Sequence, residues 1–289
     1  MNGILLVDKP EGLSSAGTIR ALKARFGAAK VGHLGTLDPF ASGLLPLCIG
    51  EATKVAGYLL LERKAYSGTI RLGIETDTLD RTGRVTATAT VPDLPAATVD
   101  ELARRFVGQQ QQVPPMFSAL KRDGVPLYKL ARRGIAVERA ARAIDIARLD
   151  LVARGPDRLD FGLECSKGTY VRVLAADLGR ALGTVAHLEA LRRTAVGWFQ
   201  VRDARTPEAL AALSELPLVS IREALAGLRS FTLEPEALVL LRRGQQGPLR
   251  RLPAPRPGEA ALVVDGAGAA AALVDVGPEG WRLARLLAT

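Results

Sequence analysis

The sequence has 289 residues, of which 48% are hydrophobic, and its formal net charge is +9. This length predicts one large domain with a smaller one, and the positive charge indicates a polyanionic partner, with nucleic acid as the first choice. Two cysteines and two histidines, far apart in the sequence, exclude a disulfide framework and a zinc site. Residues 1–10 lack the features of a signal peptide or a membrane span, so we expect a cytoplasmic protein without a metal or a membrane contact.

The first elements predicted along the chain are a strand, a turn and a helix. Residues 4–7 form a short apolar run that predicts a buried strand, and the Pro- and Gly-containing residues 8–12 end it. Ser14 or Ser15 can cap the helix that follows, whose apolar residues recur at helical spacing as far as Phe26.

Residues 31–48 are the most informative stretch of the chain. Three glycines and two prolines predict that it is mostly loop, and its many leucines indicate that this loop lies on an apolar core. Asp38 precedes a proline, which pushes it into an extended and fixed backbone conformation. A carboxylate held beside apolar walls suits nucleophilic or acid–base chemistry. The alternative is a structural turn in which the carboxylate accepts hydrogen bonds from nearby amides.

The next region alternates between regular elements and polar loops. We predict a short helix from residue 50, a strand at 64–73, a polar loop at 76–83 and an amphipathic helix at 98–107. From local sequence alone, Tyr66 is a half-buried aromatic residue of the strand.

Residues 109–142 are unusual in composition. They begin with four glutamines, and residues 113–142 carry seven basic and two acidic side chains, which is more than half of the net charge of the chain. Charge concentrated in this way predicts contact with phosphates, and proline and glycine near both ends predict a semi-detached segment that can close on a ligand. The alternative is a solvated helix flanked by loops. The residues that we expect to bind RNA are Lys121, Lys129, Arg132, Arg133 and Arg142.

Two strands and a helix are predicted after this basic segment. Residues 144–152 and 158–165 alternate as neighbouring strands do, and a helix begins near Val171. Arg172 lies at the N-terminus of this helix, where a cation opposes the helix dipole, so it requires an anionic partner. We expect this partner to be Asp38, which a bound guanidinium would keep ionised and oriented.

The last part of the chain predicts a second domain. Short helices lead to a new unit near Phe231, so we divide the chain into 1–230 and 231–289. Short apolar runs separated by glycine-containing turns predict strands at 260–264, 270–276 and 281–287. From residue 229 onward the chain has eight basic and six acidic side chains, so we expect this unit to assist binding rather than dominate it.

Several motifs, in the expected order, resemble those of the bacterial tRNA pseudouridine synthases of the TruB family. Residues 32–46 read G-H-L-G-T-L-D-P-F-A-S-G-L-L-P, which is similar to the family pattern G-H-T-G-T-L-D-P-x-A-[ST]-G-[LV]-L-[PV] and departs from it at Leu34. Further matches are K-P-x-G-x-[ST]-S at 9–15, T-D-T-x-D at 76–80, the P-P-x-[FY]-S-A-x-K segment at 114–121, G-T-Y-[IV]-R at 168–172 and A-H-[LMV]-x-x-L-R-R at 186–193.

The resemblance implies an α+β fold of the pseudouridine synthase type. The expected architecture is a mixed, largely antiparallel central sheet flanked by helices, with a mobile RNA-gripping insertion at about 109–142 and a small C-terminal β-barrel of the PUA type. The implied activity is isomerisation of uridine to pseudouridine in the TΨC loop of tRNA, at position 55, on a base extruded from the stack. No cofactor is expected, because this isomerisation involves no redox step and no external group.

The resemblance also implies roles for individual residues. Asp38 is the nucleophile, Tyr66 stacks on the base, and Arg172 orients Asp38. The substrate-binding set is His33, Lys54, Tyr66, Asp80, Tyr170, Arg172 and Leu191. Arg192 and Arg193 are expected either to touch phosphate or to face solvent.

Three interpretations of the whole chain are compatible with its residues. The first is a tRNA-modifying enzyme that acts as a monomer without a protein partner. The second is a non-catalytic RNA-binding or tRNA-folding protein that uses the same basic surface. The third is a synthase that depends on a guide RNA and partner proteins.

Overall fold

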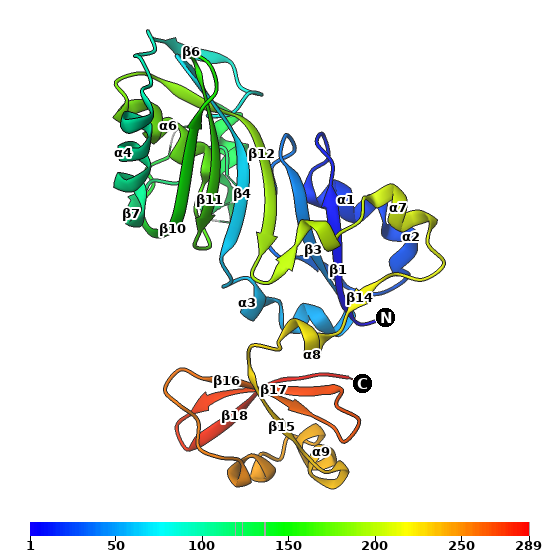
Figure 1. Cartoon of the computed structure of the whole chain (residues 1–289). Coiled ribbons are helices and arrows are strands. Elements are labelled where there is room, and N and C mark those ends of the chain that lie inside the picture. The colour runs from blue at the N-terminus through cyan, green and yellow to red at the C-terminus, as the bar shows by residue number, and fades with distance from the viewer. Residues whose placement is uncertain (119, 123, 136, 289) are drawn as a thin grey trace.

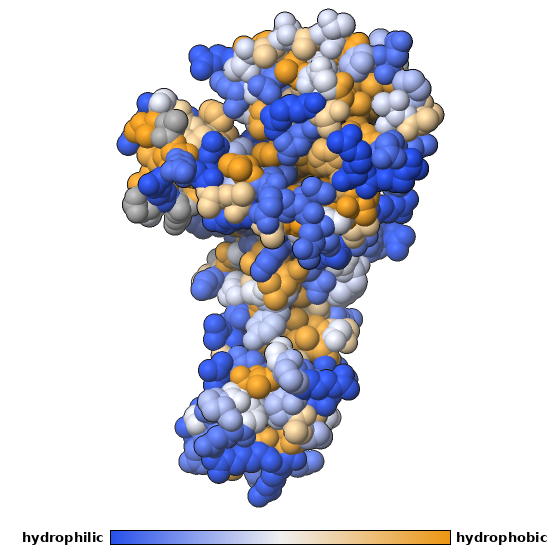
Figure 2. All heavy atoms as spheres, turned by 90° about the vertical axis from the view of Figure 1, so that its left-hand side faces the viewer, coloured by the Kyte–Doolittle hydropathy of each residue, from blue (hydrophilic) through white to orange (hydrophobic). Residues whose placement is uncertain are grey.

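The computed structural model describes residues 1–118, 120–122, 124–135 and 137–288. Figure 1 shows a large part built on one long sheet and, below it, a small part with its own sheet. Figure 2 shows the same two parts as lobes joined by a narrow waist. Within the described ranges, no helix is both long enough and apolar enough to cross a membrane.

Ten strands form the central sheet. They are β1 (Gly3–Lys9), β2 (Val31–His33), β3 (Ser42–Ile49), β4 (Lys64–Leu72), β7 (Gly108–Gln112), β10 (Arg142–Ala153), β11 (Arg158–Cys165), β12 (Ala186–Val196), β13 (Phe199–Gln200) and β14 (Leu218–Val219). The main order is β14-β1-β3-β12-β4-β11-β10-β7, with β2 paired to β3 and β13 paired to β12. Among the described strand pairs of this central sheet, only the pairing of β12 with β3 is parallel, so the predicted mixed, largely antiparallel sheet is confirmed.

Short helices surround this sheet. The helices are α1 (Ser15–Ala21), α2 (Lys23–Phe26), α3 (Ala56–Leu59), α4 (Ala96–Phe106), α5 (Leu127–Ala131), α6 (Val171–Ala181), α7 (Pro207–Ala212) and α8 (Ile221–Ala224), with 3-10 turns η1 (Gly50–Lys54) and η2 (Val201–Asp203). Helix α4 packs on β10 and α6 packs on β12 (Figure 1). Ser14 caps α1 as predicted, because its hydroxyl accepts a hydrogen bond from the amide of Gly17 at 3.0 Å.

The prediction that residues 31–48 are mostly loop is wrong. Residues 42–49 form β3, which lies between β1 and β12, and only residues 34–41 remain irregular. The strand is buried on both faces: Leu45 and Leu47 belong to one apolar cluster, and Leu44 to another. This burial outweighs the glycine and proline signals.

The insertion is shorter than predicted. The glutamines at 109–112 belong to β7, which pairs with β10, so the chain leaves the central sheet only at residue 113 and returns at Arg142. Polar residues are tolerated in β7 because it is the outermost strand and alternates between half-buried and exposed positions as far as Gln111. Gln112 is buried, and its side-chain amide is hydrogen-bonded to the backbone of Tyr170. Between these points lie α5 and a two-stranded ribbon of β8 (Lys121–Arg122) and β9 (Val125–Pro126). A second ribbon, of β5 (Ile74–Thr76) and β6 (Val85–Thr88), follows β4.

The C-terminal part is a four-stranded sheet with the order β15-β16-β17-β18. Its elements are β15 (Arg229–Thr232), α9 (Pro235–Arg242), η3 (Gly247–Arg251), β16 (Ala260–Val264), β17 (Ala270–Gly277) and β18 (Gly280–Leu286). The strands fall close to the predicted runs, and the sheet begins two residues before the predicted boundary at 231. Among the residues described, no pairing joins β18 back to β15.

The two faces of this small sheet serve different cores. Leu262 and Leu273 pack into the apolar cluster that contains Leu44 and Leu34 of the large part. The neighbouring residues along the strands, such as Val263, point to the opposite face and pack with α9. The small sheet therefore shares a continuous core with the large part.

We expect the Leu273→Ala substitution to destabilise the folded chain by about 2–5 kcal/mol, because Leu273 is fully buried in the shared core and its truncation leaves a cavity. Urea unfolding followed by circular dichroism would measure this loss. Leu240→Ala in α9 is the control, since Leu240 is 37% exposed. If Leu273→Ala lowered the free energy of unfolding no more than Leu240→Ala does, the shared core would not have the stabilising role described.

Candidate active site

The loop of residues 34–41 is fixed by the core beneath it. Leu37 and Phe40 are buried in the large apolar cluster. The hydroxyl of Ser15 accepts a hydrogen bond from the amide of Leu37 at 2.9 Å and donates one to its carbonyl at 3.1 Å. Asp38, which lies between these anchors, therefore has a defined backbone position.

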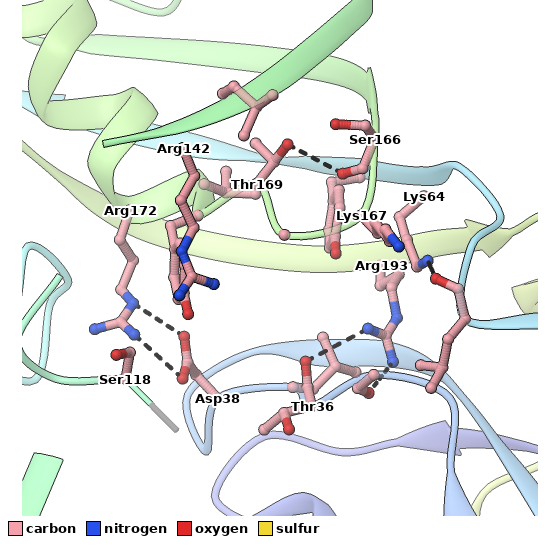
Figure 3. A pocket seen from close by; sticks show the side chains of 18 of the residues that line it. Thr36, Asp38, Lys64, Ser118, Arg142, Ser166, Lys167, Thr169, Arg172 and Arg193 are labelled. Atoms are coloured by element: carbon pink, nitrogen blue, oxygen red, sulfur yellow. Dashed lines mark hydrogen bonds and ion pairs between the residues drawn. The ribbon is translucent and has the colours of Figure 1, made fainter. Parts of the chain in front are cut away.

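Arg172 binds Asp38, as predicted from the sequence. Nε of the guanidinium lies 3.0 Å from one carboxylate oxygen of Asp38 and Nη2 lies 3.4 Å from the other (Figure 3). The Arg172 side chain is 5% exposed and that of Asp38 is 36% exposed. Burial raises the pKa of Asp38 above its ordinary value, while the charge of Arg172 opposes this rise and that of Asp80 adds to it. The guanidinium thus favours the ionised carboxylate in a partly desolvated site.

Arg172 also joins two other segments to this loop. It donates to the carbonyl of Thr78 at 3.0 Å and to that of Phe117, in the insertion, at 2.7 Å. Its Nη1 lies 3.4 Å from the buried carboxylate of Asp80. Asp80 is held in turn by the Thr78 hydroxyl at 2.8 Å and the Thr82 amide at 2.9 Å. Asp80 therefore positions Arg172 and does not line the cavity.

A cavity of about 790 Å³ opens beside the ion pair (Figure 3). This volume lies within the range of sites that hold a small ligand such as a nucleotide. The predicted residues that line it are Asp38, Tyr66, Arg142, Tyr170, Arg172 and Leu191. Residues far apart in the sequence thus form one site. Elsewhere in the described ranges, no three His, Cys, Asp or Glu side chains gather as a metal site would require.

The register of β4 and β12 explains why Tyr66 and Leu191 meet. Tyr66 is opposite Arg193, and Leu191 is opposite Gly68. Side chains two residues apart on a strand share a face, so Leu191, Arg193 and Tyr66 all face the cavity. A side chain at Gly68 would collide with the Ala190 carbonyl, at 2.1 Å from its Cβ, so only glycine permits this close pairing.

Two predicted substrate contacts lie elsewhere. His33 is in β2 and does not line the cavity; burial and the charge of Arg193 lower its pKa, so the imidazole is neutral at neutral pH. Lys54 pairs with Glu51 at 2.7 Å and donates to the carbonyl of Leu286 at 2.9 Å. Lys54 therefore lies outside the lining of the cavity, and its ammonium links η1 to the C-terminal sheet.

The predicted RNA-binding residues fall into two groups. Arg142 begins β10 and reaches into the cavity (Figure 3). Lys129, Arg132 and Arg133 lie in or directly after α5 and are exposed, with the Arg132 guanidinium 5.6 Å from the ring centre of Tyr128. The side chain of Lys121 lies outside the described part of the structure.

Sequence reasoning missed the role of Arg193. This residue neither touches the outer surface nor faces solvent: it is 1% exposed and lines the cavity. Its guanidinium donates to the carbonyls of Leu44 at 2.7 Å, Gly35 at 3.0 Å and Thr36 at 3.5 Å. The strand period carries the missed signal, because Leu191 and Arg193 must share a face. Arg192 points away and pairs with Asp8 at 2.7 Å.

Two buried lysines also support the site. Lys9 donates to the carbonyls of Leu13 at 2.7 Å and Pro39 at 3.4 Å, and so fixes the residue that follows Asp38. Lys64 lines the cavity and donates to the carbonyl of Leu60 at 2.7 Å. Burial lowers the pKa of each lysine to about 8. The Lys-Pro pair at the end of the first strand is the sequence signal that could have identified Lys9.

The fold and the site together define an enzyme of the pseudouridine synthase class, in which a carboxylate held by an arginine faces a nucleotide-sized cavity. A sequence model described as "TruB family pseudouridylate synthase (N terminal domain)" matches residues 23–171. A second, described as "tRNA pseudouridylate synthase B C-terminal domain", matches residues 172–228. This chain belongs to the TruB family of pseudouridylate synthases.

Individual relatives agree with this placement. The chain is 51% identical over 215 residues to tRNA pseudouridine synthase B of Dechloromonas aromatica, covering 74% of this chain and 72% of the relative. It is 48% identical over 236 residues to the protein of the same name from Bordetella avium, covering 80% and 97%. Among solved structures, the fold is shared with a chain of a Cbf5-Nop10-Gar1 complex, with a TM-score of 0.72 and 22% identity over 99% of this chain and 84% of that one.

We expect Arg172→Gln to raise the pKa of Asp38 further, because it removes the charge that opposes the effect of burial. An NMR titration of the side-chain carboxyl carbon of Asp38 would measure the shift. Arg180→Gln, on the outer surface of the same helix α6, is the matched control and should leave the pKa of Asp38 unchanged. An unchanged value in Arg172→Gln would contradict this account of the site.

Proposed function

We propose that this chain isomerises uridine to pseudouridine at position 55, in the TΨC loop of tRNA, with Asp38 as the reacting carboxylate. The observation that carries the proposal is the Asp38–Arg172 ion pair at the edge of a cavity whose other walls include Tyr66 and Leu191. Family membership supports the reaction class, and the relatives named tRNA pseudouridine synthase B support tRNA as the substrate.

The reaction requires the target base to leave the stack of the RNA loop. The N1–C1′ bond breaks, the base turns, and C5 joins C1′; the proton on C5 is lost and N1 gains one, so the product is an isomer. Asp38 either attacks C1′ directly or removes the 2′ proton to give a glycal, and both routes need the ionised carboxylate that Arg172 favours.

The remaining cavity residues position and enclose the base. Tyr66 lines the cavity, where its ring offers a stacking surface for the base, and its phenol is proposed to handle the C5 proton. Tyr170 and Leu191 close the cavity against water. These roles depend on the positions of the side chains around one extruded base.

The basic insertion is proposed to grip the RNA loop. Lys129, Arg132 and Arg133 present an exposed positive surface in and directly after α5. Because the carbonyl of Phe117 accepts a hydrogen bond from Arg172, closure of the insertion and orientation of Asp38 are linked. The C-terminal part, residues 229–289, is proposed to assist RNA binding as a PUA-like domain.

The chain is proposed to act alone, as a monomer, on tRNA. A guide-dependent synthase would need partner proteins, whereas the bacterial relatives that are about half identical to this chain over the aligned residues are named tRNA pseudouridine synthases. Turnover of a bare tRNA stem-loop by the purified chain separates these two possibilities. A non-catalytic RNA-binding protein would have no use for the partly desolvated Asp38 beside Arg172.

Asp38→Asn should abolish tritium release from tRNA labelled with [5-³H]uridine, because an amide can neither attack C1′ nor accept the 2′ proton. Asp145→Asn is the control, since Asp145 is half-buried, pairs with Arg63 and does not line the cavity. Normal turnover by Asp38→Asn would exclude the assignment. The affinity for the stem-loop is measured in parallel, because a variant that lost both RNA binding and turnover would not support catalysis by Asp38.

Replacing Arg132 and Arg133 with Glu should weaken stem-loop binding and lower the slope of log affinity against log salt by about 1–2, because phosphate contacts are lost. The matched control replaces Arg148 and Arg154 with Glu, which changes the net charge equally on β10 and directly after it. Filter binding at several salt concentrations would measure both. Equal weakening in the two double variants would mean that only the overall charge matters.

A further inference from the structure

Arg193 carries a buried charge without a described carboxylate partner. Its protein contacts are the backbone carbonyls of Leu44, Gly35 and Thr36 and the phenol of Tyr66. Burying a cation without a counter-ion is costly, and such groups are concentrated at functional sites. Three of its five N–H groups serve the carbonyls, which leaves two for Tyr66 and the cavity.

The position of Arg193 relates it directly to the base. Arg193 is the cross-strand neighbour of Tyr66, and Leu191 lies two residues away on the same face. A base stacked on Tyr66 beside Leu191 would thus have one edge within reach of the guanidinium. Figure 3 shows Arg193 on the opposite side of the cavity from Arg172, with Asp38 on the side of Arg172.

The cavity as a whole carries excess positive charge. Its lining includes the basic residues Lys64, Arg142, Lys167, Arg172 and Arg193. Asp38 is the one acidic residue among the described lining, and it is already paired with Arg172. The charge on the other basic residues therefore favours an anionic occupant.

We propose that Arg193 is a catalytic residue that stabilises the negative charge developing on uracil when the glycosidic bond breaks. This inference rests on the proposed isomerisation and adds a group to it. When the N1–C1′ bond breaks, its electron pair stays on the ring and spreads to O2 and O4. The guanidinium donates a hydrogen bond to one of these oxygens and transfers no proton. It is therefore unchanged when C5 joins C1′.

Arg193 thus stabilises the negative charge on the departing base, as Arg172 stabilises the negative charge on the carboxylate of Asp38. A fixed cation stabilises the transition state far more strongly in a site that excludes water than in solvent, because no solvent has to reorganise during the reaction. The carbonyls of Leu44 and Gly35 hold the guanidinium in place, so its position is set before the substrate enters.

The test compares two stem-loops, one with uridine and one with 5-fluorouridine at the target position. Fluorine withdraws electrons and makes the detached ring a better leaving group, so that the reaction depends less on Arg193. Single-turnover breakage of the N1–C1′ bond is measured for each. We expect Arg193→Met to slow the uridine reaction by about 100-fold, with a loss about tenfold smaller on 5-fluorouridine.

Two further variants distinguish a catalytic effect of Arg193 from a purely structural one. Arg193→Lys keeps the charge, so its loss should be smaller and its ratio of the two rates close to that of the wild type. If Arg193→Met does not fold, Arg193→Gln removes the charge in its place, and the same change in the ratio is expected. Arg192→Met, whose native side chain pairs with Asp8, should leave that ratio unchanged. Equal losses on both substrates in the charge-removing Arg193 variant would overturn the inference. Failure of the wild type on both stem-loops would overturn the proposed function itself.

Discussion

The site depends on one buried guanidinium. Arg172 must keep Asp38 ionised in a place where burial alone would favour its neutral form. It does so while holding the carbonyls of Thr78 and Phe117, so a single side chain fixes the carboxylate loop, the turn at Asp80 and the insertion relative to one another. An arginine suits this task because its planar fork presents several donors in fixed directions.

The same physical problem recurs on the other wall of the cavity, with a different solution. Arg193 is more deeply buried than Arg172, yet backbone carbonyls rather than a carboxylate receive its hydrogen bonds. Carbonyl dipoles orient a guanidinium without cancelling its charge. One wall therefore holds a neutralised ion pair and the other an available cation, an asymmetry that suits the proposed reaction, in which the electron pair of the N1–C1′ bond moves onto the base.

Packing connects this chemistry to the rest of the molecule. Strand β3 is covered on both faces, so one of its faces carries the core beneath the carboxylate loop and the other the core shared with the C-terminal sheet. Leu34, where the family usually has Thr, is fully buried in that shared core. Lys54 adds a polar tie at the same junction through the carbonyl of Leu286. Strand β3 thus separates the core beneath the carboxylate loop from the core that it shares with the small sheet.

Local patterns in the sequence determined the strands predicted at 4–7, 64–73, 144–152 and 158–165, the capped first helix and the start of the C-terminal sheet, because each depends on periodicity or on a neighbouring residue. The dipole of one helix indicated that Arg172 needs an anionic partner, and the structure shows that Asp38 is bound to it. Tertiary structure alone decided the rest. The glutamines of β7 join the sheet only because β10 is there to pair with them, Lys54 faces a strand more than 200 residues away, and Arg193 is buried only because β3 and β4 flank β12. Contacts of this kind depend on strand order, which no short stretch of sequence encodes.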